Sequence, residues 1–206
     1  MAYTEPTTRT TGDLITASIW NTDLTDNISF LNTNKGLWNA IGYSLLGSAG
    51  TFSFTGISGS YDDLYIDMLL RSSAAADSDG IIIRFNGDSG ANYQEQELNV
   101  SSTTVSAAQQ TGQTAFPIHT TLVDGNNATA NSFSFCRLFV PAYSSSSILK
   151  TLLLGVATMR GGSANLLAWF SGQWADTSAI TQITIASVSG NFEANSRVSI
   201  YAGQSI

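Results

Sequence analysis

The chain has 206 residues, of which 11% are charged and 43% hydrophobic, and its formal net charge is −7. Its eight basic residues are scattered singly, so we expect no nucleic-acid partner, because neutralising phosphates requires clustered Lys and Arg. A single cysteine, Cys136, excludes an intrachain disulfide framework and a zinc cluster. It lies in the apolar run SFSFCRLFV and is predicted to be a small core residue.

Two further observations bear on the cellular setting. The longest apolar run, residues 148–159, is too short to span a membrane and contains Lys150, so we expect no membrane insertion. The first residues, MAYTEPTTRT, lack a basic start followed by an apolar core, so we expect no secretory signal. The low charge and the abundance of Ser, Thr, Asn and Gly predict a neutral, polar surface.

The N-terminal region is predicted to be an irregular arm, residues 1–13, followed by a helix over residues 18–35. Ser18 is the expected N-cap, and Lys35 followed by Gly36 is the expected end. Residues that recur at helical spacing form one apolar stripe: Trp20, Leu24, Ile28 and Leu31, widened at one edge by Ile19 and Phe30.

The predicted helix needs a partner, because a short segment of this composition is only marginally helical alone. The partner is the chain's own downstream domain, identical helices of other copies, or a different protein. The spacing of Trp20, Leu24, Asn27 and Leu31 also fits a short heptad seam, in which Asn27 is the polar position that sets register and oligomer state.

The rest of the chain is predicted to be mainly β. Residues 36–50 form a connector and a first strand, and from Thr51 the hydrophobic period is two. Strands are expected at residues 63–71, 81–85, 133–140, 180–188 and 197–201. Residues 149–159 also fit a helix, but Gly155 and the β-rich neighbourhood favour a strand. The expected fold is an N-terminal arm and short α-helix, residues 1–40, followed by an antiparallel β-sandwich of jelly-roll type, residues 41–206.

The strand predicted at residues 63–71 shows the alternation most clearly. One face carries Leu64, Ile66, Met68 and Leu70. The other carries Tyr65, Asp67, Leu69 and Arg71.

The stretch TTGDLITASIWNTDLTDNISFL, residues 10–31, resembles N-terminal segments of tailed-bacteriophage virion proteins. Their recurring pattern is T-G-x-x-[VI]-T-A-S-x-W-N-x-x-[LI]-x-D-N-x-x-[FL]-L. The matching positions here are Thr11, Gly12, Thr16, Ala17, Ser18, Trp20, Asn21, Asp26, Asn27 and Leu31. The resemblance implies a virion structural protein, and it fits a head fibre, a capsid decoration protein or a tail fibre.

The C-terminal residues SAITQITIASVSGNFEANSRVSIYAG are similar to the closing strands of β-sandwich domains in phage fibres. The positions that match are Ile180, Ile183, Ile185, Gly190, Phe192, Ser196, Val198, Ile200 and Tyr201. Asn195 stands where the family has glycine, which we expect to be tolerated because Asn is enriched at positive φ. Ala202 replaces the usual glycine after the tyrosine, which leaves the end of the last strand open. The phrase RFNGDSGANY, residues 84–93, is also similar to such domains.

Candidate catalytic groups are few. His119 is the single histidine, and no G-x-S-x-G turn is present to supply a nucleophile beside it. The carboxylate pairs available for glycan hydrolysis are Asp62 with Asp63, which point to opposite faces of a strand, and Glu95 with Glu97. We interpret the second pair as a solvated edge, and we expect no enzymatic activity and no cofactor.

Two candidate binding sets remain. Asp77, Asp79 and Asp88 flank one strand but lack EF-hand spacing, so we interpret them as turn residues rather than calcium ligands. Aromatic residues that either stack on sugars or belong to the core or a subunit interface are Tyr93, Tyr143, Trp169 and Trp174.

Together these observations favour a non-enzymatic structural protein of a bacteriophage virion, anchored by its N-terminal segment. The resemblance implies a homotrimer on the virion surface, synthesised in the host bacterial cytoplasm, with other virion proteins of the capsid or tail as partners. The expected interface residues are Ile19, Trp20, Leu24, Asn27, Ile28 and Leu31. The alternative is a host-glycan-binding adhesin module of a tail fibre, and a glycan depolymerase ranks third.

Overall fold

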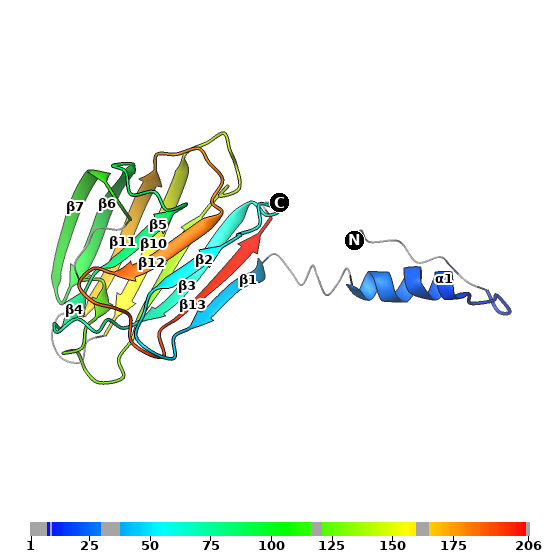
Figure 1. Ribbon diagram of the computed structural model, residues 1–206, viewed down its shortest axis with the longest axis horizontal. Coiled ribbons are helices and arrows are strands. Elements are labelled where there is room, and N and C mark those ends of the chain that lie inside the picture. The colour runs from blue at the N-terminus through cyan, green and yellow to red at the C-terminus, as the bar shows by residue number, and fades with distance from the viewer. Residues whose placement is uncertain (1–7, 9, 30–37, 117–120, 160–164, 205–206) are drawn as a thin grey trace. The chain divides into compact units, whose positions relative to one another are not determined.

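The computed structural model describes residues 8, 10–29, 38–116, 121–159 and 165–204 (Figure 1). The chain divides into two compact units, Met1–Asn39 and Ala40–Ile206. The division predicted from the sequence, after residue 40, lies one residue from this boundary.

The second unit contains two main β-sheets. The larger has eight strands in the spatial order β1 (Trp38–Leu45), β13 (Arg197–Gly203), β3 (Asp63–Leu70), β9 (Ser134–Val140), β10 (Lys150–Thr158), β11 (Leu166–Trp174), β6 (Tyr93–Ser101) and β7 (Thr104–Gln113). The smaller has three, in the order β2 (Phe52–Thr55), β12 (Gln182–Ser187) and β5 (Ile81–Phe85). Two-residue strands β4 (Ser78–Asp79) and β8 (Val123–Asp124) pair separately. From β13 to β7, and throughout the smaller sheet, neighbouring strands are antiparallel.

The predicted antiparallel β-sandwich is confirmed, and over part of its length the chain alternates between the two sheets. Strands β1, β3, β9 and β13 belong to the larger sheet, and β2, β5 and β12 come between them in the smaller sheet. After β5 the chain touches the smaller sheet again at Phe116, whose backbone exchanges hydrogen bonds of 2.7 and 3.0 Å with Ile83. The pairs β10–β11 and β6–β7 extend the larger sheet beyond β9.

A single hydrophobic core contains residues of both sheets, which lie face to face (Figure 1). The predicted inward face of β3 is confirmed, because all four of its apolar side chains are fully buried: Leu64, Ile66, Met68 and Leu70. The strand interpretation of residues 149–159 is also confirmed, with buried Leu152, Leu154 and Val156 alternating with exposed neighbours. Cys136 is buried as predicted, and this burial raises the pKa of its thiol to about 12.

Two turns carry the positive φ angles that their sequences favour. Asn86 (φ 51°) and Gly87 (φ 71°) lie between Phe85 and Asp88, and the Asp88 N–H donates to the Phe85 carbonyl at 2.9 Å. These features define a type I′ turn, for which Asn-Gly is the preferred pair. Asn195 has φ 70°, which confirms the expectation that Asn is tolerated at a position with positive φ. The last strand continues through Ala202 and ends at Gly203.

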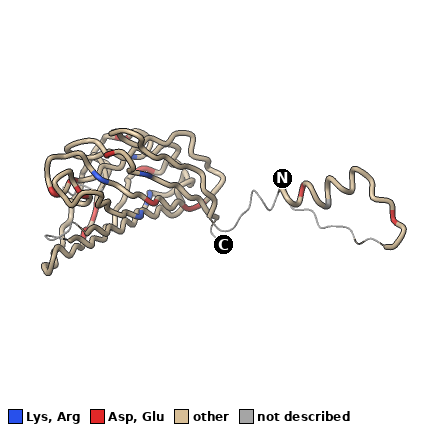
Figure 2. Tube along the Cα trace, turned by 90° about the horizontal axis from the view of Figure 1, so that it is seen from below, with Lys and Arg blue, Asp and Glu red and all other residues tan. Residues whose placement is uncertain are grey.

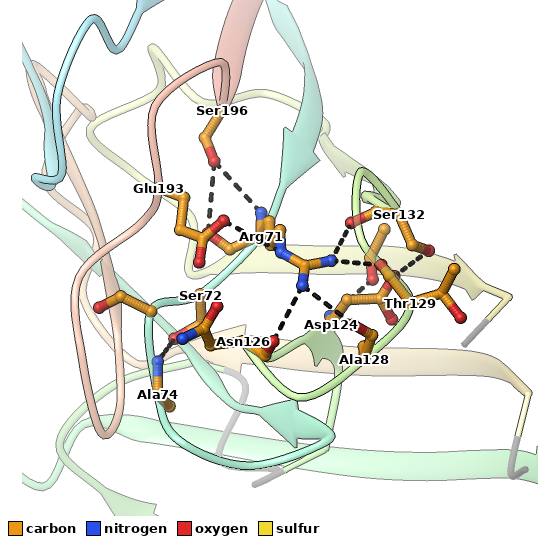
Figure 3. Close-up of polar contacts among 12 residues, drawn as sticks. Arg71, Ser72, Ala74, Asp124, Asn126, Ala128, Thr129, Ser132, Glu193 and Ser196 are labelled. Atoms are coloured by element: carbon orange, nitrogen blue, oxygen red, sulfur yellow. Dashed lines mark hydrogen bonds and ion pairs between the residues drawn. The ribbon is translucent and has the colours of Figure 1, made fainter. Parts of the chain in front are cut away.

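Arg71 corrects one expectation, because it is buried just beyond the end of β3 rather than exposed on the outward face. Its guanidinium lies against the loop before β9 and the loop before β13 (Figure 3). It donates to four carbonyl oxygens at 2.8 to 3.2 Å, those of Asn126, Ala128, Thr129 and Ser132. Its Nε pairs with Glu193 at 3.0 Å. These five contacts use all five guanidinium N–H donors, so Arg71 fastens both loops to the end of β3.

The domain is expected to fold without the N-terminal unit, because its hydrophobic core consists of residues after Ile41. A chain lacking residues 1–35 should stay soluble, keep a β-type circular dichroism spectrum and melt within about 3 °C of the full chain. Aggregation of that shortened chain would contradict this and assign the helix stripe to the domain core.

Replacing Arg71 by Met should lower the free energy of unfolding by about 3–5 kcal/mol, because Glu193 and four carbonyls lose a buried partner. Chemical denaturation measures the change. Arg84→Met is the matched control, since the Arg84 Nε donates to one carbonyl, that of Thr114, in an exposed setting. It should cost no more than about 0.5 kcal/mol. Equal losses in the two variants would rule out the fastening role of Arg71.

Candidate attachment and binding surfaces

The N-terminal helical segment begins with α1 (Ala17–Trp20) and continues as a π-helical turn, η1 (Asn21–Asp26). Its N-cap is Thr16, which corrects the prediction of Ser18. Thr16 has an extended backbone (φ −81°, ψ 163°), and its Oγ1 accepts a hydrogen bond from the Ile19 N–H at 3.3 Å. This is the conformation a cap requires, whereas Ser18 lies inside the helix. The predicted end at Lys35, together with Phe30 and Leu31, lies outside the described residues.

The apolar stripe on this segment is exposed. Trp20 is 55%, Leu24 39% and Ile28 50% exposed, and these three side chains recur at steps of four residues. Ile19 is half-buried. Asn27 is buried, at 6% exposure, in the single chain. Whether Asn27 lies at a seam between copies stays a prediction, because this burial is that of a single chain.

Three of the four aromatic residues proposed to contact glycans belong to the core. Tyr93, Tyr143 and Trp174 are each at most 1% exposed, so none of them can stack on a sugar. Polar ends of these rings have internal partners: the Phe85 N–H donates to the Tyr93 hydroxyl at 3.0 Å, and the Trp174 Nε1 donates to Asp88 Oδ2 at 2.6 Å. The Tyr143 hydroxyl donates to the Ser58 carbonyl. Only Trp169 of this set is exposed, at 51%.

Glu95 and Glu97 are buried, which corrects their interpretation as a solvated edge. Both lie on the face of β6 that also carries buried Tyr93, so the register that places Tyr93 in the core turns these two carboxylates inward. Asn99, on the same face, donates its side-chain amide to Glu97. Asp63, of the other carboxylate pair, accepts a hydrogen bond from the Ala142 N–H at 2.9 Å.

Two of the three aspartates considered as calcium ligands, Asp79 and Asp88, accept hydrogen bonds from protein donors. Asp79 is buried in β4, not in a turn, and its carboxylate accepts hydrogen bonds from Ser72 Oγ (2.6 Å), the Gly80 N–H (2.8 Å) and Ser187 Oγ. Burial alone would raise the pKa of Asp79, but the hydrogen bonds from Ser187, Ser72 and two backbone N–H groups together lower it. Within the described part of the chain, no three His, Cys, Asp or Glu side chains group so as to hold a metal ion.

Another buried carboxylate, that of Asp124, accepts hydrogen bonds from the hydroxyls of Ser132 and Thr158. Asp124 and Asp79 thus join segments that are distant in the sequence, as Arg71 does. His119, the histidine considered for catalysis, lies outside the described residues.

The outward face of the eight-stranded sheet, defined as the side turned away from the smaller sheet, carries many exposed apolar side chains. They include Tyr43, Leu98, Phe135, Leu153, Leu167 and Trp169. Two shallow hollows of about 290 and 330 Å³ lie on this unit. The first is lined by Gln94, Glu95, Gln96, Gln109, Thr151, Ser171, Gly172 and Gln173. The second is lined by Tyr43, Asp67, Met68, Leu69, Phe135, Arg197, Ser199 and Tyr201.

No protein-family model, curated protein or solved structure matches this chain. Among the described helices, none is both long and apolar enough to cross a membrane.

The lowered pKa of Asp79 gives a pH-dependent prediction. A carboxylate whose pKa is lower in the folded state stabilises the fold above its unfolded pKa, about 3.9, and loses this effect as the pH falls toward the folded pKa. Asp79→Asn should therefore lower the melting temperature at about pH 6, and this deficit relative to the parent chain should shrink toward about pH 2.5. Asp77→Asn, at an exposed position nearby, should change the melting temperature little. A deficit of constant size across that pH range would contradict the stabilising role of the ionised Asp79.

Proposed function

We propose that this chain is a non-enzymatic structural protein of a bacteriophage virion, a homotrimeric surface fibre or capsid decoration protein. In this proposal the N-terminal helical segment is the attachment element, and the β-sandwich is the part displayed on the particle. Partners of the attachment element are the equivalent segments of other copies and a capsid or tail protein.

The observation that carries the proposal is the exposed apolar stripe of Trp20, Leu24 and Ile28 in a unit separate from the sandwich. Exposing these side chains to water is unfavourable, by about 25 cal/mol for each Å² of apolar surface. A helical segment this short also gains most of its stability from packing rather than from its own hydrogen bonds. Both effects favour a state in which another chain covers the stripe.

Two further observations support the assignment to a virion. The residues of the helical segment follow the pattern quoted above for virion proteins, with Trp20, Asn21 and Asp26 among the matching positions. Charged positions are few and spread over the sandwich (Figure 2). A surface of hydroxyls and amides suits a protein that stands beside many identical copies, because it limits repulsion between chains of net charge −7.

Replacing Leu24 by Asp tests the proposal, because it places an unpaired charge in the stripe. Burying such a charge costs several kcal/mol per subunit, and symmetry repeats the cost in every copy. We expect the variant to keep its β-type circular dichroism spectrum, to sediment as a smaller species and to fail to incorporate into phage particles.

Thr25→Asp is the matched control, since it adds the same charge at the adjacent, exposed position outside the stripe. It should sediment and incorporate like the parent chain. Incorporation of Leu24→Asp at normal stoichiometry would refute the attachment role. A lower melting temperature with unchanged oligomer mass would instead assign the stripe to the protein's own domain.

A further inference from the structure

Trp169 lies flat on the outward face of the sheet. Its position in β11 is opposite Gly155 in β10, and a Cβ built on Gly155 would lie 3.1, 3.3 and 3.5 Å from three atoms of the indole six-membered ring. Nearly equal distances to three ring atoms mean that the ring plane covers Gly155. Gly155 therefore leaves room for the ring to rest on the sheet, and the opposite ring face accounts for the 51% exposure of Trp169.

The surroundings of this ring are apolar on one side and rich in amides on the other. Leu98, its neighbour in β6, is 52% exposed, and Leu153 in β10 is 44% exposed. Ser171 lies two residues further along β11, about 7 Å away, and lines the hollow of about 290 Å³. That hollow also contains Gln94, Gln96, Gln109 and Gln173.

The amides of this hollow have hydrogen-bonding capacity beyond their contacts with one another. The Gln94 Nε2 donates to the Gln173 Oε1 at 2.7 Å, and the Gln96 Nε2 donates to the Ala108 carbonyl at 2.9 Å. Each Gln side chain offers two donors and two acceptor lone pairs, of which these contacts use a fraction. Donors and acceptors are therefore mixed within one small area.

The charges near the ring and the hollow are already paired or buried. Arg137 lies two strands from Trp169 in the same row, and it makes bidentate contacts of 2.6 and 2.7 Å with Asp67. Lys150 is fully buried and donates to three carbonyl oxygens, and the carboxylate of Glu95 is also buried. A ligand of this surface therefore needs apolar C–H groups and hydroxyls rather than charge.

We propose that Trp169 and the adjoining Gln cluster (Gln94, Gln96, Gln109 and Gln173) bind a chain of neutral hexopyranose sugars. The flat faces of such sugars present C–H groups that pack on the electron-rich face of an indole. Their hydroxyls both donate and accept hydrogen bonds, as the amides do. A sugar stacked on Trp169 places the next residue of the glycan over the amide-lined hollow. This site does not depend on the proposed virion function, because the domain carries it whether or not the protein is attached to a particle.

Calorimetric titration of the full chain with neutral hexasaccharides tests the site. The probes are maltohexaose, cellohexaose, chitohexaose in its N-acetylated form and a galactose hexasaccharide, with polygalacturonate as the acidic comparison. At least one neutral probe should bind with a Kd below about 1 mM. Trp169→Ala should weaken that binding at least about tenfold, and Trp169→Phe, which retains a planar ring, should weaken it less.

Tyr43→Ala is the matched control, because Tyr43 is an exposed aromatic residue in β1, at the other end of the same sheet. It should change the affinity by less than about twofold. The proposal is overturned if no neutral probe binds at about 10 mM, if only polygalacturonate binds, or if Trp169→Ala and Tyr43→Ala have equal effects. It is also overturned if Trp169→Ala reduces the oligomer mass while sugar binding is unchanged, because the ring then lies between copies of the chain.

Discussion

Burial of one face of the eight-stranded sheet is the constraint on which the rest of this domain depends. The smaller sheet has three strands, and it packs on one side of the larger sheet. Strands such as β3, β9 and β10 therefore alternate between a buried side chain and a half-buried or exposed one, as antiparallel strands with one solvated face do. The side chains on the outward face of the larger sheet do not belong to the hydrophobic core, so they are available to bind a ligand.

Buried polar groups hold the ends of this sandwich where strand pairing stops. Arg71, Asp79 and Asp124 are each almost completely buried, and each accepts or donates several hydrogen bonds to segments far away in the sequence. A buried charge is tolerated only with such partners. These three charged groups therefore act as structural supports of the domain.

Strands β3 and β5 could be predicted because every second residue in them is apolar and buried. The strand predicted at residues 81–85 has the same bounds as β5, and the alternation in β3 predicted its buried face correctly. Strand β6 was missed because Glu95 and Glu97 point inward while Gln94 and Gln96 point outward, so the sequence shows no hydrophobic period. Strand β11 was missed for the opposite reason, since Leu167 and Trp169 make its outward face apolar as well. Without β11, nothing in the sequence indicated that Trp169 and Trp174, five residues apart, point to opposite faces.

The proposed attachment role depends on the N-terminal unit. Its stripe is apolar, regular and exposed, and a short helical segment is stable only when packed. Hydrogen–deuterium exchange of the amides in residues 17–29 tests this most directly, in assembled particles and in dilute free protein. If another chain covers the stripe, these amides should exchange at least about a hundredfold more slowly in the assembled state. Exchange as fast as in an isolated peptide of residues 8–35 in both states would contradict the account.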